Sequence, residues 1–266
     1  MNILIPMAGE GKRFQEAGYD ISKPAIPTYD VRTGEKLPMV VCSARCLPGA
    51  ADDGSNLIFV ERDFHSVNGT QAHIQKQFPQ ARFISVSELT EGQACTCLLA
   101  EKWIDSEEEL LIAGCDNGMV IHEGRFQALT AEADVIVFTY RNNDAVLTNP
   151  DAYGWMKTDQ VDNIIGVSIK KALSDTPKND HAVVATFWFR HGWQFVKAAK
   201  KMISENDRIN NEFYVDEAVK HALELGYRAK VFEVDRYIGW GTPKDYEDYQ
   251  ATFEYWQGFA AKEGLL

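Results

Sequence analysis

The first group of residues suited to chemistry lies in a glycine-rich segment close to the amino terminus. The segment Ala8–Phe14 contains Gly9, Gly11 and Arg13, and Lys23 follows it. Glycines have no Cβ, so backbone N–H groups can approach a polyphosphate closely, and the two cations add neutralising charge. The segment therefore predicts a binding site for the phosphates of a nucleotide. A tight turn with solvated basic residues is the alternative interpretation of the glycines alone.

Two well-known phosphate-binding motifs do not describe this segment. The dinucleotide-binding fingerprint requires a third glycine, and the P-loop requires Gly-Lys followed by Ser or Thr. Neither sequence follows Gly11. The phosphate site must therefore belong to another class of nucleotide-binding protein.

An acidic residue, Asp116, ends the second segment that could do chemistry. The apolar run Leu110–Ala113 leads through Gly114 and Cys115 to this Asp. A carboxylate at the end of a buried strand costs free energy unless it has a partner, and Mg²⁺ bound to phosphate oxygens is such a partner. Asp116 is therefore a candidate metal ligand. A turn or helix-capping Asp is the alternative.

The elements that must position these residues alternate along the first half of the chain. Short apolar runs typical of strands buried on both faces are separated by segments with helical periodicity. The expected strands are 3–5, 57–60, 83–86, 110–113 and 135–138, and the expected helices are 39–47, 69–78, 94–103 and 125–131. This alternation predicts an α/β protein with a mostly parallel sheet flanked by helices.

The second half of the chain has a different pattern. Strand-like segments with little helix between them predict a mixed or antiparallel extension of the sheet, and helices return later. The expected strands are 153–157, 164–170 and 183–189, followed by helices 194–203 and 215–225 and a last helix with Thr242 as N-cap and Pro243 as first residue. Without a repeat or a linker, we expect one domain over 1–266, with an NTP-binding half at about 1–140 and an acceptor-binding half at about 141–266.

The glycine-rich segment resembles the opening signature of the sugar-phosphate nucleotidyltransferases. The matching residues are Gly9, Gly11, Arg13, Lys23, Pro24 and Pro27, with Lys-Pro in place of the commoner Pro-Lys. The resemblance implies a Rossmann-like fold of the nucleotide-diphospho-sugar transferase type, in the short form without a C-terminal repeat domain. It also implies that the glycine-rich loop beginning at Ala8 binds the triphosphate together with Arg13. Lys23 would neutralise charge around the α-phosphate.

Further segments match the family's base-binding and acceptor-binding regions. The resemblance places Gly92 and Gln93 at the base, where a plain helix start is the alternative. It places Gly154 beside the acceptor and assigns the acceptor phosphate to Lys171, with Lys170 as the other option.

Two more residues are candidates for the acceptor side. Glu212 matches the family's Glu that binds acceptor hydroxyls, and could instead be a charge favoured at a helix amino terminus. His181 could face the acceptor, although a lone His is more often structural.

The resemblance departs from the family at the second metal ligand. Relatives often carry an Asp where this chain has Gly239, and Asp235 is the nearest carboxylate that could replace it. Either Asp235 reaches the metal, or Asp116 holds Mg²⁺ largely through phosphates and water, which this ion tolerates.

Charge and composition exclude several classes of partner. The formal net charge of -12 argues against a nucleic-acid polymer, whose binding relies on Lys and Arg. No apolar stretch has the length of a membrane span. The chain has five Cys, an odd number, and no secretory leader, so we expect a cytoplasmic protein in which Cys42, Cys46, Cys95 and Cys97 are small core residues.

The function that these residues predict is transfer of a nucleoside monophosphate from an NTP to a phosphorylated acceptor. The expected acceptor is a sugar 1-phosphate used for surface polysaccharide, the cofactor is Mg²⁺, and CTP, UTP or dTTP is expected rather than ATP or GTP. A cytidylyltransferase for phosphocholine or a phosphorylated amide is one alternative. Two alternatives come from other functional classes: a glycosyltransferase that uses a nucleotide-sugar, and a nucleotide-binding regulator without catalytic activity. Trp and Tyr residues near the last helix could form a homodimer contact.

Overall fold

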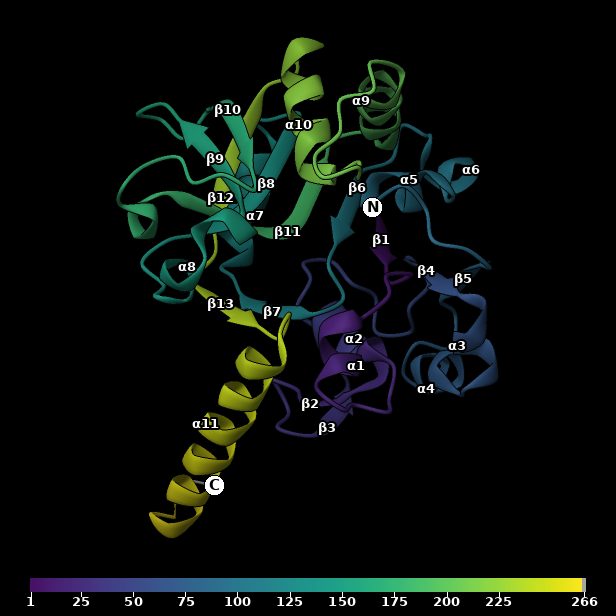
Figure 1. Cartoon of the computed structure of the whole chain (residues 1–266), viewed down its shortest axis with the longest axis vertical. Helices are drawn as coiled ribbons and strands as arrows, with labels where there is room; N and C mark the ends of the chain where they lie inside the picture. The colour runs from purple at the N-terminus through teal and green to yellow at the C-terminus, as the bar shows by residue number, and fades with distance from the viewer. Residues whose placement is uncertain (265–266) are drawn as a thin grey trace.

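The computed structural model of the protein describes residues 1–264, and a nine-stranded β-sheet lies at its centre (Figure 1). Four strands of the amino-terminal half are β1 (Asn2–Pro6), β4 (Leu57–Arg62), β5 (Arg82–Val86) and β6 (Leu110–Ala113). They lie in the order β5–β4–β1–β6 and run parallel to one another. The parallel strands predicted from the apolar runs are thus confirmed.

Strand β1 is the central strand of this parallel part. Ile3 pairs with Leu57 of β4 on one side and with Leu111 of β6 on the other. Ile3, Leu4 and Ile5 are all 0% exposed. Because successive side chains of a strand point to opposite faces, three consecutive buried residues mean that both faces of the sheet are covered.

The carboxyl-terminal half extends the same sheet with mixed strand directions. Its strands are β8 (Val135–Tyr140), β9 (Gly154–Thr158), β10 (Ile164–Ile169), β11 (His181–Phe189) and β12 (Ala229–Glu233). Strand β11 pairs antiparallel with β6, β8 and β9, β9 pairs antiparallel with β10, and β12 pairs parallel with β8. Within the nine-stranded sheet, all strands except β10 and β11 therefore run in one direction. The predicted mixed extension of the sheet is confirmed.

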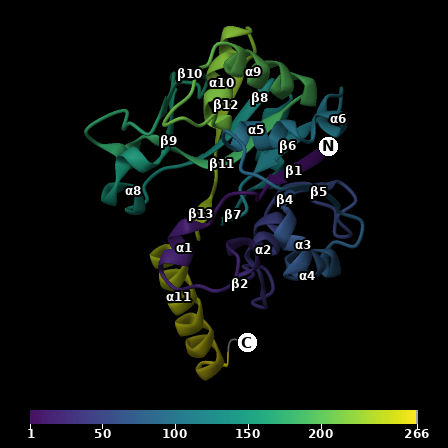
Figure 2. The same cartoon turned by 45° about the vertical axis from the view of Figure 1, so that its right-hand side comes forward.

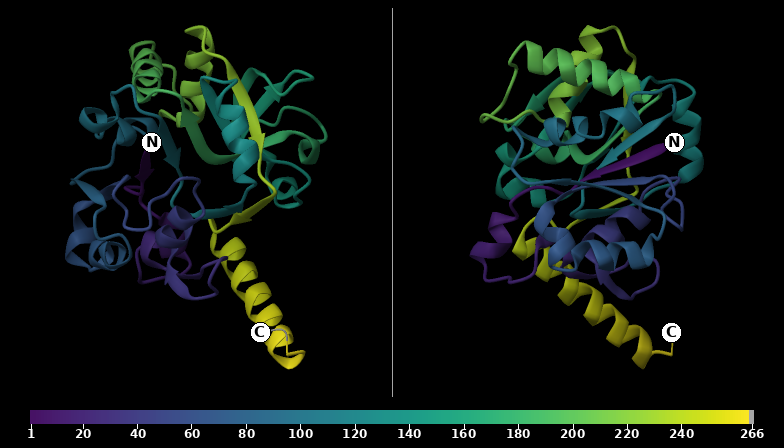
Figure 3. Two further views of the ribbon diagram at one scale, coloured as in Figure 1. Left: turned by 180° about the vertical axis from the view of Figure 1, so that it is seen from behind. Right: turned by 90° about the vertical axis from the view of Figure 1, so that its right-hand side faces the viewer.

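Helices cover the sheet on both faces, as the edge-on view in Figure 3 shows. One face packs on α2 (Met39–Arg45), α4 (Thr70–Gln77) and α7 (Glu123–Thr130). The other face packs on α5 (Gln93–Leu98), α6 (Glu101–Ile104), α9 (Gly192–Ser204) and α10 (Val215–Glu224). The remaining short helices are α1 (Lys12–Glu16), α3 (Asp63–Val67), α8 (Ala145–Thr148), η1 (Lys23–Ala25), η2 (Pro150–Ala152) and η3 (Pro177–Asn179).

One predicted helix is interrupted, and several short strands were not predicted. The helix expected over 94–103 forms as α5 and α6, with the break at Leu99 and Ala100. Two small ribbons, β2 (Pro27–Tyr29) with β3 (Lys36–Pro38) and β7 (Asn117–Val120) with β13 (Arg236–Gly239), lie outside the large sheet. Strands of three or four residues are too short to show a periodicity, so their pairing is decided by tertiary contacts.

The last helix, α11 (Pro243–Lys262), extends away from the body of the molecule (Figure 2). As predicted, Thr242 is its N-cap, and the side chain of this residue accepts a hydrogen bond from the backbone of Asp245. Near its middle the helix packs on the β2–β3 ribbon, where the rings of Tyr29 and Phe253 stack with centroids 4.5 Å apart. Trp256 is 58% exposed farther along, and the predicted homodimer contact of this helix stays a prediction.

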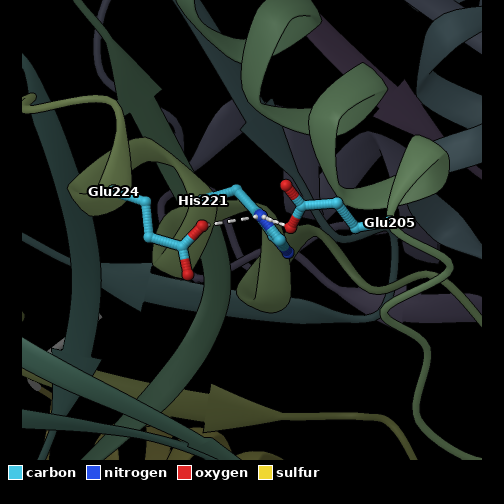
Figure 4. Close-up of side chains that lie close together, drawn as sticks. All are labelled: Glu205, His221 and Glu224. Carbon is cyan, nitrogen blue, oxygen red and sulfur yellow. Dashed lines mark ion pairs between the residues drawn. The ribbon is translucent and has the colours of Figure 1, made fainter.

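A buried His joins α9 and α10 at one end (Figure 4). The Nε2 atom of His221 lies 3.0 Å from Asp207 Oδ2, and its Nδ1 atom lies 3.2 Å from Glu224 Oε2. Lys201 on α9 donates to Glu205 at 2.6 Å and to Glu224 at 2.5 Å. Lys201 thus neutralises Glu205 and Glu224, whereas Lys220 donates to Asp207 at 2.5 Å.

Among residues 1–264, no helix is both long and apolar enough to cross a membrane.

A buried carboxyl in β4 makes the stability of the fold depend on pH. Glu61 is 0% exposed, and its one hydrogen bond comes from Ser85 Oγ at 3.3 Å. Burial raises its pKa from 4.5 to about 7, against a small opposing effect of Ser85. Between pH 4.5 and about 7, the folded state therefore keeps a proton on Glu61 that the unfolded state has released. The free energy of unfolding therefore falls as the pH rises through this window.

We expect Glu61→Gln to remove this pH dependence. From pH 5 to pH 8 the free energy of unfolding of the wild type should fall relative to Glu61→Gln by up to about 3 kcal/mol. Urea unfolding at both pH values measures the difference, with Glu88→Gln on the exposed loop after β5 as control. If the free energies of unfolding of wild type and Glu61→Gln differ by the same amount at both pH values, Glu61 is not protonated in the folded protein.

Gly92 joins the two halves of the chain by a backbone contact that admits no side chain. Its φ is +126°, and a Cβ at this position would lie 2.5 Å from the backbone nitrogen of Phe213. Phe213 donates to the carbonyl of Glu91 at 2.8 Å and accepts from Ala94 at 2.9 Å. The loop before α5 and the segment before α10 are therefore locked together.

Gly92→Ala should lower the free energy of unfolding by about 3 kcal/mol or more, because backbone cannot move aside as a side chain can. Gly69→Ala is the matched control, since Gly69 has φ +85° but nothing within 4 Å of an added Cβ. The control should lose about 1–2 kcal/mol from the left-handed conformation alone. Chemical unfolding of both variants measures this, and equal losses would rule out the close contact as the cause.

Candidate active site

A cavity of about 400 Å³ lies beyond the carboxyl ends of β1 and β6. Open α/β sheets bind ligands at this edge, and the volume lies within the usual range for small-molecule sites. Of the residues predicted from the sequence, the cavity wall contains Ala8, Gly9, Gly11, Lys23, Gly92, Gln93, Asp116 and Glu212. The structure thus brings the predicted nucleotide-binding residues other than Arg13 together with Asp116 and one predicted acceptor residue, Glu212, whereas Gly154 is not part of the wall.

The glycine-rich loop forms the part of the wall that follows β1. An added Cβ at Gly9 would meet no atom within 4 Å, so this backbone is open to a ligand. Gly11 has φ +68° and precedes the first turn of α1. Arg13 on α1 has an exposed side chain that is not part of the cavity wall, but its charge lowers the pKa of Asp116. Arg13 therefore acts on the cavity from its rim.

An ion pair between Lys23 and Asp116 lies in the cavity wall. Lys23 Nζ donates to Asp116 Oδ2 at 2.5 Å and to the carbonyl of Gly241 at 3.2 Å. Burial by itself lowers the pKa of Lys23 and raises that of Asp116, but the attraction between the two groups outweighs burial. The net result is a raised pKa for Lys23 and a lowered pKa for Asp116. Both groups are therefore charged at neutral pH.

The backbone around Asp116 is fixed from three directions. The carbonyl of Asp116 accepts from Trp240 at 3.0 Å. Two residues earlier, Gly114 donates to the carbonyl of Ala185 on β11 at 2.9 Å and accepts from Ser43 Oγ on α2 at 2.7 Å. The carboxylate therefore sits at the end of a buried strand, where the sequence predicted it.

The structure does not bring Asp235 to Asp116. In the β7–β13 ribbon Gly239 pairs with Asn117 beside Asp116, whereas Asp235 donates its backbone N–H to Val120 at the other end. The carboxylate of Asp235 pairs with Arg125 at 2.7 Å and is 42% exposed. The ribbon separates the two carboxylates by the length of β7, so Asp235 is not positioned as a second metal ligand.

The donor set at the cavity limits how it can hold Mg²⁺. In the described part of the chain, Asp116 belongs to no group of three His, Cys, Asp or Glu side chains close enough to share an ion. Mg²⁺ commonly takes one or two carboxylates and completes its octahedral shell with phosphate oxygens and water. The residues present fit an ion held by Asp116 and substrate oxygens, and they do not form an all-protein cage.

The wall that follows β4 and β5 contains a His that sequence reasoning did not identify. His65 on α3 is 1% exposed, and its Nδ1 accepts the backbone N–H of Arg62 at 3.3 Å. Burial, with help from the charge of Arg62, lowers the pKa of His65 to about 4, so the ring is neutral. Because Nδ1 is the acceptor, Nε2 carries the proton and can donate to a ligand. Only this tertiary position distinguishes His65 from the other His of the sequence.

On the predicted acceptor side, a half-buried carboxyl occupies the space beside Gly154. A Cβ at Gly154 would lie 2.3 Å from Asp216 Oδ1, so this glycine admits Asp216. Burial raises the pKa of Asp216 to about 6, against the opposing charge of Lys170. Lys170 Nζ hydrogen-bonds the carbonyl of Ala152 and lies 5.7 Å from the centre of the Tyr214 ring. Asp216 and Lys170 thus form a half-buried polar pair next to the predicted acceptor region.

Lys171 and His181 do not reach the cavity wall. Lys171 has an exposed side chain, whereas the neighbouring Lys170 is half-buried. His181 is 7% exposed, and its Nδ1 lies 2.9 Å from the hydroxyl of Thr139, which is the contact of a structural His. Lys170 is not part of the cavity wall either, although it is less exposed than Lys171.

No protein-family model and no curated protein matches the sequence. Solved structures nevertheless share its fold. A nucleoside-diphosphate-sugar pyrophosphorylase from Vibrio cholerae RC9 has a TM-score of 0.73 at 18% identity and covers 93% of this chain and 98% of that chain. A UDP-glucose pyrophosphorylase complexed with UDP-glucose has a TM-score of 0.67 at 17% identity, with 97% and 98% covered.

An inositol-1-phosphate CTP transferase from T. maritima is also similar, with a TM-score of 0.62 at 14% identity and coverage of 94% of this chain and 93% of that chain. These neighbours are all less than 25% identical to the chain, so they show its fold. The chain has the predicted fold, a mixed and mostly parallel Rossmann-like sheet flanked by helices, of the nucleotide-diphospho-sugar transferase type.

Proposed function

We propose that the protein transfers a nucleoside monophosphate from an NTP to a phosphorylated acceptor and releases pyrophosphate. The observation that carries this proposal is the ion pair of Lys23 and Asp116 beside an open glycine-rich loop, in one cavity. The structural neighbours named above are pyrophosphorylases and a CTP transferase, which supports the general reaction.

The reaction needs no protein nucleophile. An oxygen of the acceptor phosphate attacks the α-phosphorus of the NTP, the bond from that phosphorus to the bridging oxygen of the β-phosphate breaks, and pyrophosphate leaves with the electron pair. Two anions must approach each other, so catalysis depends on alignment and on fixed positive charge. Lys23 supplies that charge inside the cavity and Arg13 supplies it from the rim.

Asp116 would hold Mg²⁺ together with phosphate oxygens, and the ion would supply further charge neutralisation. In the resting protein Lys23 neutralises Asp116. Lys23 is thus placed to turn from this carboxylate to the α-phosphate when a nucleotide enters.

The acceptor that we propose is a sugar 1-phosphate, used by a cytoplasmic enzyme of surface polysaccharide synthesis. Lys170, rather than Lys171, would hold the acceptor phosphate, and Glu212 in the cavity wall would accept hydrogen bonds from acceptor hydroxyls. A pyrimidine nucleotide, CTP, UTP or dTTP, is the proposed donor. A non-sugar phosphate with CTP is the second candidate, because one structural neighbour is named as a CTP transferase.

An assay of pyrophosphate release tests the reaction. The full-length protein with Mg²⁺ is incubated with each NTP in turn and with sugar 1-phosphates, phosphocholine or a phosphorylated amide. We expect release with one pairing of donor and acceptor. Lys23→Ala should lower turnover by ~10²-fold or more, since it removes a preorganised charge and leaves Asp116 unpaired.

Lys12→Ala is the matched control, because Lys12 is 67% exposed and pairs with Glu10 on the surface. It should leave turnover within a few fold of the wild type. Turnover of Lys23→Ala within a few fold of the wild type would remove Lys23 from the mechanism. Binding of a nucleotide-sugar without pyrophosphate release in any pairing would favour a glycosyltransferase instead.

His65 is expected to hold the nucleotide as a neutral donor. Removing its N–H in His65→Leu should raise the KM for the NTP about tenfold, the effect of losing one hydrogen bond, with little change in kcat. His65→Gln should restore part of the affinity, and His73→Leu on the exposed face of α4 is the control. Steady-state kinetics measure both constants, and an unchanged KM in His65→Leu would contradict this role.

A further inference from the structure

A second cavity, of about 300 Å³, shares no wall residue with the first. It lies between the loop that follows β2, the carboxyl end of α2 and the loop that follows α2. Its wall contains Asp30, Arg32, Thr33, Arg45, Asp52 and Phe78. Charged groups of both signs on a partly apolar wall are typical of a site for a small polar ligand.

Asp30 has one carboxylate oxygen in use and one without a donor. Its side chain is 1% exposed, and Oδ1 accepts hydrogen bonds from the backbones of Arg32 and Thr33, both at 2.9 Å. Oδ2 is buried and accepts no hydrogen bond from any described residue, with Arg45 Nη1 at 3.9 Å. A buried carboxylate oxygen without a donor costs free energy, so this oxygen is suited to a ligand that brings one.

Two guanidinium groups supply the opposite charge. Arg45 is 28% exposed, and one of its five N–H groups donates to Gln77 Oε1 at 2.9 Å. Arg32 lies on the exposed side of the same wall. Guanidinium groups bind phosphate with paired hydrogen bonds, so the two Arg are suited to a phosphate group.

The cavity is joined to the Lys23–Asp116 pair by two elements. Asp30 directly follows β2, and this strand continues the segment that begins with Lys23 in η1. Arg45 is the last residue of α2, and Ser43 of the same helix holds the carbonyl of Gly114 close to Asp116. A ligand that moves Asp30 and Arg45 would therefore act on both members of the ion pair.

We propose that this cavity is an effector site for a small phosphate monoester that also carries a hydroxyl or amino group. The phosphate binds Arg32 and Arg45, the hydroxyl or amino group donates to Asp30 Oδ2, and binding changes the affinity of the first cavity for its nucleotide. The volume is about ten times that of one water molecule, which leaves room for more than inorganic phosphate. The change in nucleotide affinity rests on the proposed function, whereas the binding site does not.

Calorimetric titration of the full-length protein tests the binding site. The probes are ribose 5-phosphate, glucose 6-phosphate, AMP and inorganic phosphate. At least one ester should bind wild type and Lys23→Ala equally well, because Lys23 belongs to the other cavity. Arg45→Met and the isosteric Asp30→Asn should each weaken that binding tenfold or more, with thermal unfolding to confirm that both variants are folded. Arg82→Gln, an exposed substitution elsewhere, is the control.

Four results would overturn the binding site. They are no binding of any ester, full binding by both cavity variants, loss of binding in Lys23→Ala, or inorganic phosphate binding as tightly as the best ester.

Pyrophosphate release with and without the bound ester tests the effector role. The KM for the NTP should change at least twofold in the wild type and stay constant in Asp30→Asn. A constant KM in an active wild type would overturn the effector role. A protein that releases no pyrophosphate would contradict the proposed function instead, and the titration would still decide the binding site.

Discussion

The ion pair between Lys23 and Asp116 is the interaction on which the rest of the site depends. The Lys23 and Asp116 side chains are partly buried, at 18% and 31% exposed, so deleting one would leave the other partly desolvated and uncompensated. Here the partners come from η1 and from the turn after β6, and Lys23 is also held by the carbonyl of Gly241. The glycine loop, the β7–β13 ribbon and the start of α11 must therefore meet at one point. Under the proposed function, a nucleotide that enters the cavity would offer Lys23 a second anion and change this balance.

A few cations lie at or near the cavity of this acidic chain. A net charge of -12 repels anions from most of the surface. The cavity wall combines the ammonium group of Lys23 with the carboxylates of Glu10, Asp116 and Glu212, and the cations Arg13 and Lys170 lie outside the wall. Lys170 adopts φ +56° and is half-buried, so its ammonium group is positioned by backbone and packing together. The neighbouring Lys171, identical in type, is exposed.

Sequence patterns predicted the residues that act locally and missed those that depend on distant contacts. Buried parallel strands give continuous apolar runs, so β1 and β6, and with them Asp116, could be located from the sequence. Gly92 also lies where predicted, although its need for φ +126° arises from Phe213, far along the chain. His65 becomes a candidate only once burial fixes its charge and Arg62 fixes its tautomer. The predicted role of Asp235 failed because the short β7–β13 pairing, which separates it from Asp116, has no signature in the sequence.

The glycine at position 239 is tied to the packing of a neighbouring ring. A Cβ there would lie 3.2 Å from the Tyr237 hydroxyl, and the Tyr237 ring stacks on Tyr140 with centroids 4.1 Å apart. A side chain at this position would require the stacked ring to move by a few tenths of an ångström. Asp116 remains the candidate metal ligand in the cavity wall, and Lys23 already neutralises that group. Mg²⁺ would therefore gain most of its ligands from the phosphates, so that metal and nucleotide would bind together.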